Sequence, residues 1–441
     1  MPLRSRSYSH SQRRYCLMNL KIRPSKLSGT IAVPGSKSHT IRAVAMAMMA
    51  EGKSTINAPL ISEDTLSAIR AAEAFGMKLN RGDDTVWTAE GLAGNLQEPT
   101  GVVDMANSGT SIKIFAALAA QKNIKAVFDG DKSLRSRPMK SLLDALDQCG
   151  VETSSDNGKC PFSVKGPFKE HKKIIVNGKS SQYVSAMLFA SAFSDCGETI
   201  DVVDVNEQPY IGLTLSWMKR LGLQFEAAEN YTHFEVPGGQ NTKGFTFTIP
   251  ADFSTAAFPL AAAAVTKSEI DILNLDFMDV QGDKGVFVLL NQMGTEIKKM
   301  GGKTTVKGGT LNGIEIDLNA MPDALPALSV VAAFAEGTTK LYNVAQARIK
   351  ETDRIACMTK ELQKMGVKVT ELPDGMIIEG GKPKGAVVES YGDHRIAMAL
   401  AVAGLAAEGE TIIRGAECAA VTYPAFFDSF KALGADFTLE D

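Results

Sequence analysis

The sequence lacks the features that would place it at once in several common protein classes. Its six cysteines in 441 residues include no CxxC pair, so neither a zinc knuckle nor a dithiol redox motif is indicated. The longest apolar runs, such as residues 396–407, are about a dozen residues long, whereas a membrane-spanning helix needs about 20. The net charge is only -3, so we expect neither nucleic acid nor a membrane as a partner. We therefore expect a cytoplasmic protein with reduced thiols.

Several widespread catalytic motifs are also missing. The chain has no GxGxxG, HExxH or GxSxG sequence. The run GSKS at residues 35–38 resembles part of a nucleotide P-loop, but it lacks the GxxxxGK(S/T) spacing, so we exclude a nucleotide-binding loop of that type. Residues 1–17 contain four arginines and no acidic residue, and we expect them to be disordered. The folded part is expected to start at Met18.

A repeated pattern organises the rest of the chain. Six amphipathic segments each end at a glycine that precedes an alternating strand, and these glycines recur roughly every 72 residues. Glycine suits such a position because it adopts the left-handed conformation that ends a helix. We predict six helices with one face near solvent. Their glycines are Gly76, Gly150, Gly222, Gly294, Gly366 and Gly434.

Six segments of a second kind alternate with these. They are rich in alanine and apolar nearly all round, so helices formed from them must be buried. Each unit of roughly 72 residues therefore supplies one buried helix, one partly exposed helix and several strands. Solenoid repeats are usually shorter, so we predict closed α/β domains with three units in each of two pseudo-symmetric halves.

The openings of the six buried helices are unusually polar. Ser, Thr, Asn and Asp are common helix caps, but several of these caps also have a glycine and a basic residue beside them. Free N–H groups and the positive end of the helix dipole bind phosphate or carboxylate. If several openings meet, they form an anion site in this slightly acidic protein. The openings are residues 34–38, 107–111, 178–182, 252–255, 322–323 and 392–395.

Two further segments carry basic residues. Arg135 and Arg137 lie in a turn-like segment, and residues 350–354, Lys-Glu-Thr-Asp-Arg, follow a strand. We place the two acids of the second segment in the first turn of a helix, where the helix dipole favours negative charge.

With these residues the sequence resembles the 5-enolpyruvylshikimate-3-phosphate synthases, also called 3-phosphoshikimate 1-carboxyvinyltransferases. The resemblance runs from about Met18 to the C-terminus and is carried by PGSKSHTIR, NSGTS, SLRSRPM, SSQ, QPYI, RIKETDR and YGDHRIAM, in the family's order. It implies an α/β fold, a two-domain inside-out α/β barrel built from six βαβαββ-type repeats. Residues 18–32 and 249–441 would form domain one, and residues 33–248 would form domain two.

The resemblance also implies the reaction. A monomeric enzyme would transfer the carboxyvinyl group of phosphoenolpyruvate to the 5-hydroxyl of shikimate 3-phosphate by addition and elimination, with no metal or organic cofactor. The implied catalytic residues are Asp323 as base, Glu351 as proton donor, and Lys37. The implied phosphoenolpyruvate ligands are Lys37, Gly109, Arg137, Gln182, Arg354 and Arg395. The implied shikimate 3-phosphate ligands are Lys37, Ser38, Arg42, Ser180, Ser181, Gln182, Tyr210, Asp323, Gln346 and Lys350.

The sequence departs from the family pattern at five positions. Lys113 replaces a usual Arg, Gln346 replaces an Asn near the sugar, and Glu207 stands where a Ser often contacts the sugar phosphate. Ile114 replaces a Pro of the sensitive plant and enteric members, and Val421 replaces a Lys of some members. The last two changes predict weaker inhibition by glyphosate, which in this family occupies the phosphoenolpyruvate site.

Two other functions fit parts of the same pattern. Enolpyruvyl transferases that use UDP-N-acetylglucosamine share the fold, but many carry a Cys in the loop that here reads GDKSLRSRP. A non-catalytic repeat protein that binds anions would not need Asp323 and Glu351 beside the basic cluster. The SSQ and KETDR motifs favour the shikimate enzymes over the UDP-N-acetylglucosamine enzymes.

Overall fold

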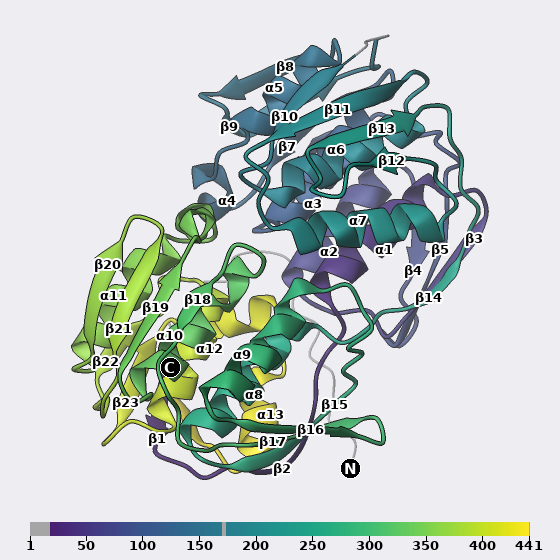
Figure 1. Ribbon diagram of the computed structural model, residues 1–441. Helices are drawn as coiled ribbons and strands as arrows, with labels where there is room; N and C mark the ends of the chain where they lie inside the picture. Colours follow the sequence, from purple (N-terminus) through teal and green to yellow (C-terminus); the bar gives the residue numbers. More distant parts are fainter. Residues whose placement is uncertain (1–17, 170–172, 441) are drawn as a thin grey trace.

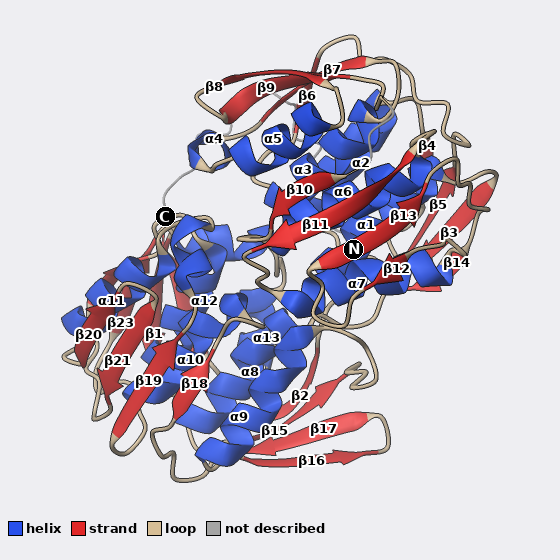
Figure 2. Ribbon diagram, turned by 45° about the horizontal axis from the view of Figure 1, so that its top comes forward, coloured by secondary structure: helices blue, strands red, loops and turns tan. Residues whose placement is uncertain are grey.

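The computed structural model of the chain describes residues 18–169 and 173–440 (Figure 1). The segment predicted to be disordered, residues 1–17, lies outside these ranges. The described chain forms two lobes, one coloured purple to teal and the other mainly green to yellow. In Figure 2 the strands lie mostly toward the outside of each lobe, and the helices gather between them. This arrangement is the inside-out α/β architecture that the family resemblance implies.

Within the described residues the strands form six four-stranded sheets. Each sheet has one parallel pair at one edge, and its other neighbouring strands are antiparallel. In order across the sheet, one sheet of the first lobe contains β22 (Val387–Glu389), β23 (Thr411–Arg414), β1 (Asn19–Arg23) and β24 (Asp436–Glu440), and another contains β16 (Glu296–Met300), β17 (Lys303–Lys307), β15 (Glu269–Leu273) and β2 (Ser28–Ala32). The third contains β18 (Glu315–Asp317), β19 (Thr338–Tyr342), β21 (Gly375–Glu379) and β20 (Lys368–Leu372). In the second lobe the sheets, in spatial order, are β10 (Ile174–Asn177), β11 (Gly197–Val203), β13 (His233–Pro237) and β12 (Glu226–Ala227); β14 (Thr246–Thr248), β3 (Lys53–Asn57), β5 (Val86–Glu90) and β4 (Lys78–Asn80); and β6 (Val102–Asp104), β7 (Lys125–Asp129), β9 (Lys159–Lys165) and β8 (Glu152–Asp156).

The two predicted kinds of helix are both present. The buried helices are α1 (Lys37–Met49), α3 (Gly109–Ala120), α6 (Ser181–Phe193), α8 (Phe253–Val265), α10 (Leu325–Ala333) and α12 (His394–Gly404). The partly exposed helices are α2 (Glu63–Ala74), α5 (Lys140–Gln148), α7 (Gln208–Arg220), α9 (Gly285–Met293), α11 (Arg354–Lys364) and α13 (Phe426–Ala432). The six predicted glycines follow these exposed helices with φ between 75° and 118°, which confirms their capping role. Shorter helices are α4 (Lys132–Ser136), η1 (Gly282–Lys284), η2 (Pro322–Ala324), η3 (Ala345–Ile349) and η4 (Ala416–Val421).

The buried apolar side chains form two separate clusters. One contains residues from Leu20 to Val33 and from Ala251 to Phe437, and the other runs from Ile41 to Ile249. Three buried helices fill the centre of each lobe: α8, α10 and α12 pack together in the first lobe, and α1, α3 and α6 in the second. Because alanine-rich faces allow close approach, three such helices fit inside a ring of three sheets.

The chain crosses between the lobes twice, and it exchanges two edge strands as it does so. In a regular unit the edge strand is followed by its own buried helix, as in β6, α3 and β7. By contrast, β2 precedes α1 but pairs with β15, which follows α8. In turn β14 precedes α8 but pairs with β3, which follows α1. Each lobe is therefore completed by a strand at a crossing.

The two crossing segments are also bound to each other. Gly35 and Ala251 form an antiparallel bridge, in which the Ser36 N–H donates to the carbonyl of Pro250 at 2.8 Å and the Asp252 N–H to that of Pro34 at 2.9 Å. A Cβ atom at Gly35 would lie 2.5 Å from the carbonyl oxygen of Ala58, so only glycine fits here. The crossings thus run side by side immediately before α1 and α8.

Candidate active site

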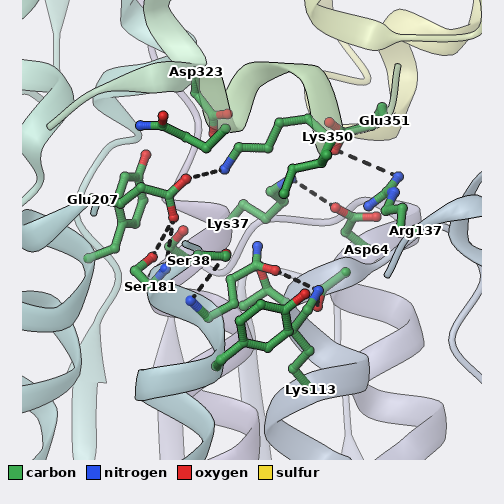
Figure 3. Close-up of a pocket in the computed structure, with 18 of the residues that line it drawn as sticks. Lys37, Ser38, Asp64, Lys113, Arg137, Ser181, Glu207, Asp323, Lys350 and Glu351 are labelled. Carbon is green, nitrogen blue, oxygen red and sulfur yellow. Dashed lines mark hydrogen bonds and ion pairs between the residues drawn. The ribbon is translucent and has the colours of Figure 1, made fainter. Parts of the chain in front are cut away.

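A cavity lies between the lobes, where the openings of the buried helices meet (Figure 3). All the predicted site residues except Arg354 and Arg395 line it, which gathers residues separated by up to about 310 positions in the chain. The lining comprises Lys37, Ser38, Arg42, Asp64, Gly109, Thr110, Lys113, Arg137, Pro138, Ser180, Ser181, Gln182, Tyr183, Glu207, Tyr210, Asp323, Gln346, Ile349, Lys350 and Glu351.

Three helix openings of the second lobe form one wall of this cavity. Ser36, Ser108 and Ser180 are the caps of α1, α3 and α6, and each accepts a backbone N–H of its own first turn. Their positive helix ends therefore point toward the same space. This convergence is the anion-binding geometry that the polar openings predict.

Lys37 is held in place by carboxylates on both sides. Its Nζ is 2.9 Å from Oδ2 of Asp64, and its backbone N–H donates to Oδ2 of Asp252 at 3.0 Å. Asp252 is the cap of α8, so the opening of α8 contributes to the site by fixing Lys37. Asp64 gave no signal in the sequence, because an acid in the first turn of α2 is ordinary.

Arg137 follows the short helix α4 and is largely buried in the cavity wall. One of its guanidinium nitrogens contacts Asn107 and donates to Oγ of Ser133 at 3.1 Å. Within the described residues its buried Nε has no hydrogen-bond partner, and its Nη1 lies beside Gly109. The neighbouring Arg135 instead pairs with Asp129 on the surface, so only one of the two arginines belongs to the site.

The first lobe contributes the opposite wall, with two carboxylates. Asp323 contacts Arg354 at 2.9 Å and Arg395 at 3.1 Å, and Glu351 contacts Arg354 at 2.5 Å. Arg354 also binds Asp393, the cap of α12, at 2.8 Å. Arg354 and Arg395 therefore lie directly behind the cavity lining, where they hold its two acids.

The pKa values of these acids follow from that pairing. Burial by itself raises the pKa of Asp323, but Arg395, Lys350 and Arg354 outweigh it and hold that pKa below its ordinary value. The pKa of Glu351 is likewise well below its ordinary value, because Arg354 and Arg137 outweigh burial. Both carboxyls are therefore ionised at neutral pH.

The segment around Glu351 differs from the expectation in one respect. The sequence predicts both acids of residues 350–354 in the first turn of a helix. In the structure α11 begins at Arg354, with Asp353 as the cap that accepts the Ala356 N–H at 3.0 Å. Glu351 lies in the turn before the helix, so its carboxylate is free to face the cavity.

The opening of α6 forms the far end of the cavity. The Ser181 N–H and Oγ both donate to Glu207, at 3.1 Å and 2.7 Å, and Glu207 also contacts Nζ of Lys350 at 2.5 Å. Gln182 donates from Nε2 to Oγ1 of Thr110 at 3.0 Å and accepts at Oε1 from Lys113. This end therefore joins both lobes through hydrogen bonds.

Arg42, Tyr210 and Gln346 have structural partners in addition to facing the cavity. Burial lowers the pKa of Arg42 to about 10, and its Nε donates to Oγ1 of Thr214 at 3.0 Å. The hydroxyl of Tyr210 donates across the lobes to Oδ2 of Asp283 at 2.6 Å. Gln346 donates from Nε2 to the carbonyl of Asn319 at 3.2 Å. All three side chains are therefore preset in position.

The sequence marks Lys113 only as a departure from the family pattern, but in the structure Lys113 lines the cavity. Its Nζ donates to the carbonyl of Gly109 at 3.0 Å and to Oε1 of Gln182 at 2.8 Å. Burial, together with the charges of the neighbouring Arg137 and Lys350, lowers the pKa of Lys113 to about 7. Val421, another of the five departures, does not line the cavity.

In residues 18–169 and 173–440, no group of three or more His, Cys, Asp or Glu side chains is placed to hold a metal ion. None of the helices in those ranges is both long and apolar enough to cross a bilayer.

The chain is similar to known proteins over nearly its whole length. The sequence profile of EPSP synthase (3-phosphoshikimate 1-carboxyvinyltransferase) matches residues 22–430. The 3-phosphoshikimate 1-carboxyvinyltransferase of Acetivibrio thermocellus is 46% identical over 96% of this chain and 99% of its own length, and that of Methanococcus aeolicus is 38% identical over 94% and 98%. A solved EPSP synthase structure from Acinetobacter baumannii superimposes with a TM-score of 0.81 at 28% identity, covering 96% of this chain and all of that one. The chain therefore belongs to the EPSP synthase family.

Proposed function

We propose that this chain is a 3-phosphoshikimate 1-carboxyvinyltransferase, which transfers the enolpyruvyl group of phosphoenolpyruvate to shikimate 3-phosphate and releases phosphate. The observation that carries the proposal is the cavity itself, where Lys37, Arg137 and Lys350 surround the carboxylates of Asp323 and Glu351. The cations suit two anionic substrates, and the two carboxylates suit a reaction that moves two protons.

The phosphoenolpyruvate half of the site is assigned to the openings of α1 and α3. Lys37, Gly109, Arg137 and Gln182 hold the phosphate, and Nη1 of Arg137, which lies beside Gly109, supplies a donor for it. Forked guanidinium groups bind carboxylates in two places at once, so Arg354 and Arg395 are suited to the substrate carboxylate. To bind it they loosen their contacts with Asp323 and Glu351.

The acceptor half is assigned to the opening of α6 and the facing first lobe. Hydrogen-bond donors there suit the phosphate and hydroxyl groups of shikimate 3-phosphate. The residues assigned to the acceptor are Lys37, Ser38, Arg42, Ser180, Ser181, Gln182, Tyr210, Asp323, Gln346 and Lys350.

The proposed chemistry uses the two carboxylates in turn. Asp323 accepts the proton of the attacking hydroxyl, while a protonated Glu351 delivers a proton to the methylene carbon, so that a C–O bond forms and a methyl group results. Glu351 then takes a proton back from that methyl group as the bond to phosphate breaks, and the proton on Asp323 leaves with phosphate. When Arg354 turns to the substrate carboxylate, the pKa of Glu351 rises, which prepares it to carry a proton.

The proposal extends to the organisation of the whole chain. We assign residues 18–32 and 249–441 to domain one and residues 33–248 to domain two, supported by the two apolar clusters. We further assign a monomeric state and a cytoplasmic location. Size-exclusion chromatography with light scattering tests the first assignment, because a monomer has a mass of 47.1 kDa.

A phosphate-release assay on the full chain tests the reaction. Phosphate should appear only when phosphoenolpyruvate and shikimate 3-phosphate are both present. UDP-N-acetylglucosamine as the sole acceptor should give none, and release with it would support the related sugar-nucleotide enzyme instead. Substrate binding without release would indicate a non-catalytic anion-binding protein.

A pair of lysine variants links that activity to the cavity. Lys37→Ala should lower kcat by roughly 10²-fold or more, the usual effect of losing a strong electrostatic donor at developing charge. Lys53 is an exposed residue of β3 in the second lobe, so Lys53→Ala is the matched control and should leave activity unchanged. Equal activity of the two variants would remove Lys37 from the site.

A further inference from the structure

Glu207 places a buried carboxylate in the half of the cavity that is assigned to the acceptor. It is the cap residue of α7, in the left-handed conformation at φ 53°, and its side chain is only 2% exposed. A buried glutamate is costly unless it is paired. Here both of its oxygens are used, one by Ser181 and the other by Lys350 (Figure 3).

The partners of Glu207 are the donors that an external anion needs. They are a backbone N–H in the first turn of a helix, a hydroxyl and an ammonium group, supplied by Ser181 and Lys350 from opposite lobes. Burial opposes the charge on Lys350, but Glu207 and Asp323 outweigh it and raise the pKa of Lys350. The carboxylate is thus placed where a phosphate monoester would receive the same hydrogen bonds.

We propose that Glu207 is a resident anion that competes with the acceptor's phosphate for Ser181 and Lys350, and so determines acceptor affinity and selectivity. The inference rests on the proposed function, which assigns those two residues to the acceptor. A phosphorylated acceptor must move the carboxylate aside, since two anions cannot share these donors without strong repulsion. An unphosphorylated acceptor leaves the carboxylate where it is.

An open cleft beside the cavity can accommodate the displaced carboxylate of Glu207. The residues on either side of it, Asn206 and Gln208, line an adjoining open cleft with a volume of about 1260 Å³. Lys179 also lines that cleft and supplies a cation. The Glu207 N–H is held by Oδ1 of Asn319 at 3.3 Å, so the side chain can turn toward water while the backbone keeps its place.

Two variants of Glu207 test this role. Glu207→Ser removes the competing charge and retains a small polar group, and Glu207→Gln keeps the shape and one acceptor oxygen. Glu198→Gln is the matched control, since Glu198 is a buried glutamate of the same lobe, on β11, that does not line the cavity. The measurements are the KM of each substrate with the other saturating, and the inhibition constant of inorganic phosphate against shikimate 3-phosphate.

We expect the KM of shikimate 3-phosphate to fall about tenfold in Glu207→Ser and less in Glu207→Gln, because a like charge at an anion site costs at least that much. The inhibition constant of inorganic phosphate should fall with it, while the KM of phosphoenolpyruvate changes much less. Binding of unphosphorylated shikimate should weaken or stay constant in Glu207→Ser, because the variant lacks the carboxylate and leaves Ser181 and Lys350 unpaired. Glu198→Gln should change none of these constants.

An unchanged or higher KM of shikimate 3-phosphate in Glu207→Ser, with normal melting temperature, would overturn the inference and make Glu207 a clamp between the lobes. If Glu207→Ser does not fold, Glu207→Gln decides the matter by the same measurement. A wild-type enzyme that releases no phosphate with both substrates contradicts the proposed function instead. Calorimetric binding of shikimate 3-phosphate to wild type and variant still compares the two affinities in that case.

Discussion

The side chain of Lys113 loses its positive charge as the pH rises through neutrality. Burial lowers its pKa to about 7, so the side chain is largely protonated below pH 7 and largely neutral above it. Because its Nζ lies beside Gly109 and Gln182, loss of this charge weakens anion binding. We expect the KM of phosphoenolpyruvate to rise between pH 6 and pH 9, about tenfold as one charge contact is lost.

Lys113→Arg is the control for that pH profile. A guanidinium stays protonated throughout this range, so the KM of phosphoenolpyruvate should vary much less with pH in the variant. Steady-state kinetics at constant ionic strength give both profiles. If the two profiles coincide, another group causes the pH dependence.

Glu351 is the residue expected to carry the proton to and from carbon. Glu351→Gln keeps its size but cannot exchange a proton, so we expect kcat to fall by about 10²- to 10⁴-fold. Both substrates should still bind, because Arg354 retains Asp393 and Asp323 as partners and keeps its position. Calorimetry and single-turnover kinetics separate the two effects. A variant that loses only affinity would make Glu351 a binding residue.

Individual site residues were predictable to the extent that their local sequence was unusual. Lys37 and Ser181 stand out because they open helices beside glycine or serine, where anion binding is favoured. Asp64 does not stand out, and only the fold brings it to Lys37. Glu207 was visible as a departure, but its pairing with Lys350 joins two lobes and has no local signal.

The helix α3 connects a core position to the cavity. Ile114 is fully buried in this helix, five residues after Gly109. A proline there removes a helix N–H and crowds the carbonyl of Thr110, which lines the cavity. We expect Ile114→Pro to lower the free energy of unfolding by about 3 kcal/mol and to shift the first turn of α3.

That shift should be visible in inhibition by glyphosate. The wild type is expected to show a higher ratio of the glyphosate inhibition constant to the KM of phosphoenolpyruvate than a sensitive plant enzyme, and Ile114→Pro should lower it. Both ratios are measured at one salt concentration. Ile114→Val, which keeps the helix N–H, is the matched control. If Ile114→Pro leaves the ratio unchanged, Ile114 and the first turn of α3 do not set the response to glyphosate.

Most elements followed from local patterns, but their pairing did not. The spacing of the six glycines predicted the exposed helices, and the alanine-rich segments predicted the buried ones, because each pattern reflects burial along one helix. The exchange of β2 and β14 between lobes was not predicted from these patterns. The sequence of such a short edge strand does not indicate which strand it pairs with. Here neither strand pairs with the strand that follows the next buried helix, because β2 pairs with β15 and β14 pairs with β3.

The two-lobed molecule is expected to close on its substrates. Contacts already bridge the lobes at the cavity, including Tyr210 with Asp283 and Glu207 with Lys350. Saturating shikimate 3-phosphate should replace the second of these contacts with its own contacts to both lobes and reduce the radius of gyration in small-angle scattering, by a few per cent for a hinge motion of domains. An unchanged scattering profile would indicate a rigid cavity.

The division of the whole molecule into two halves could be inferred from the six-unit repeat. The position of the boundary and the contacts between the two halves could not be inferred from it. A repeat count of six suggests three units per half, whereas the boundary near residues 33 and 249 came from the family resemblance. Val33 packs in the first apolar cluster and Ile249 in the second, so each crossing anchors one residue into the opposite lobe. Such anchoring depends on tertiary contacts alone.

The bonded pair of crossings fixes the pivot of any such motion. Both crossings pass through the bridge between Gly35 and Ala251, and the Lys37 N–H is tied to Asp252 directly beyond it. Atoms near a pivot sweep short arcs and distant atoms sweep long ones. Lys37 therefore stays nearly stationary relative to both lobes, while the pair formed by Glu207 and Lys350 travels further. The first anion to bind therefore meets Lys37 already in position, and the residues further from the pivot reach the anion only when the lobes close.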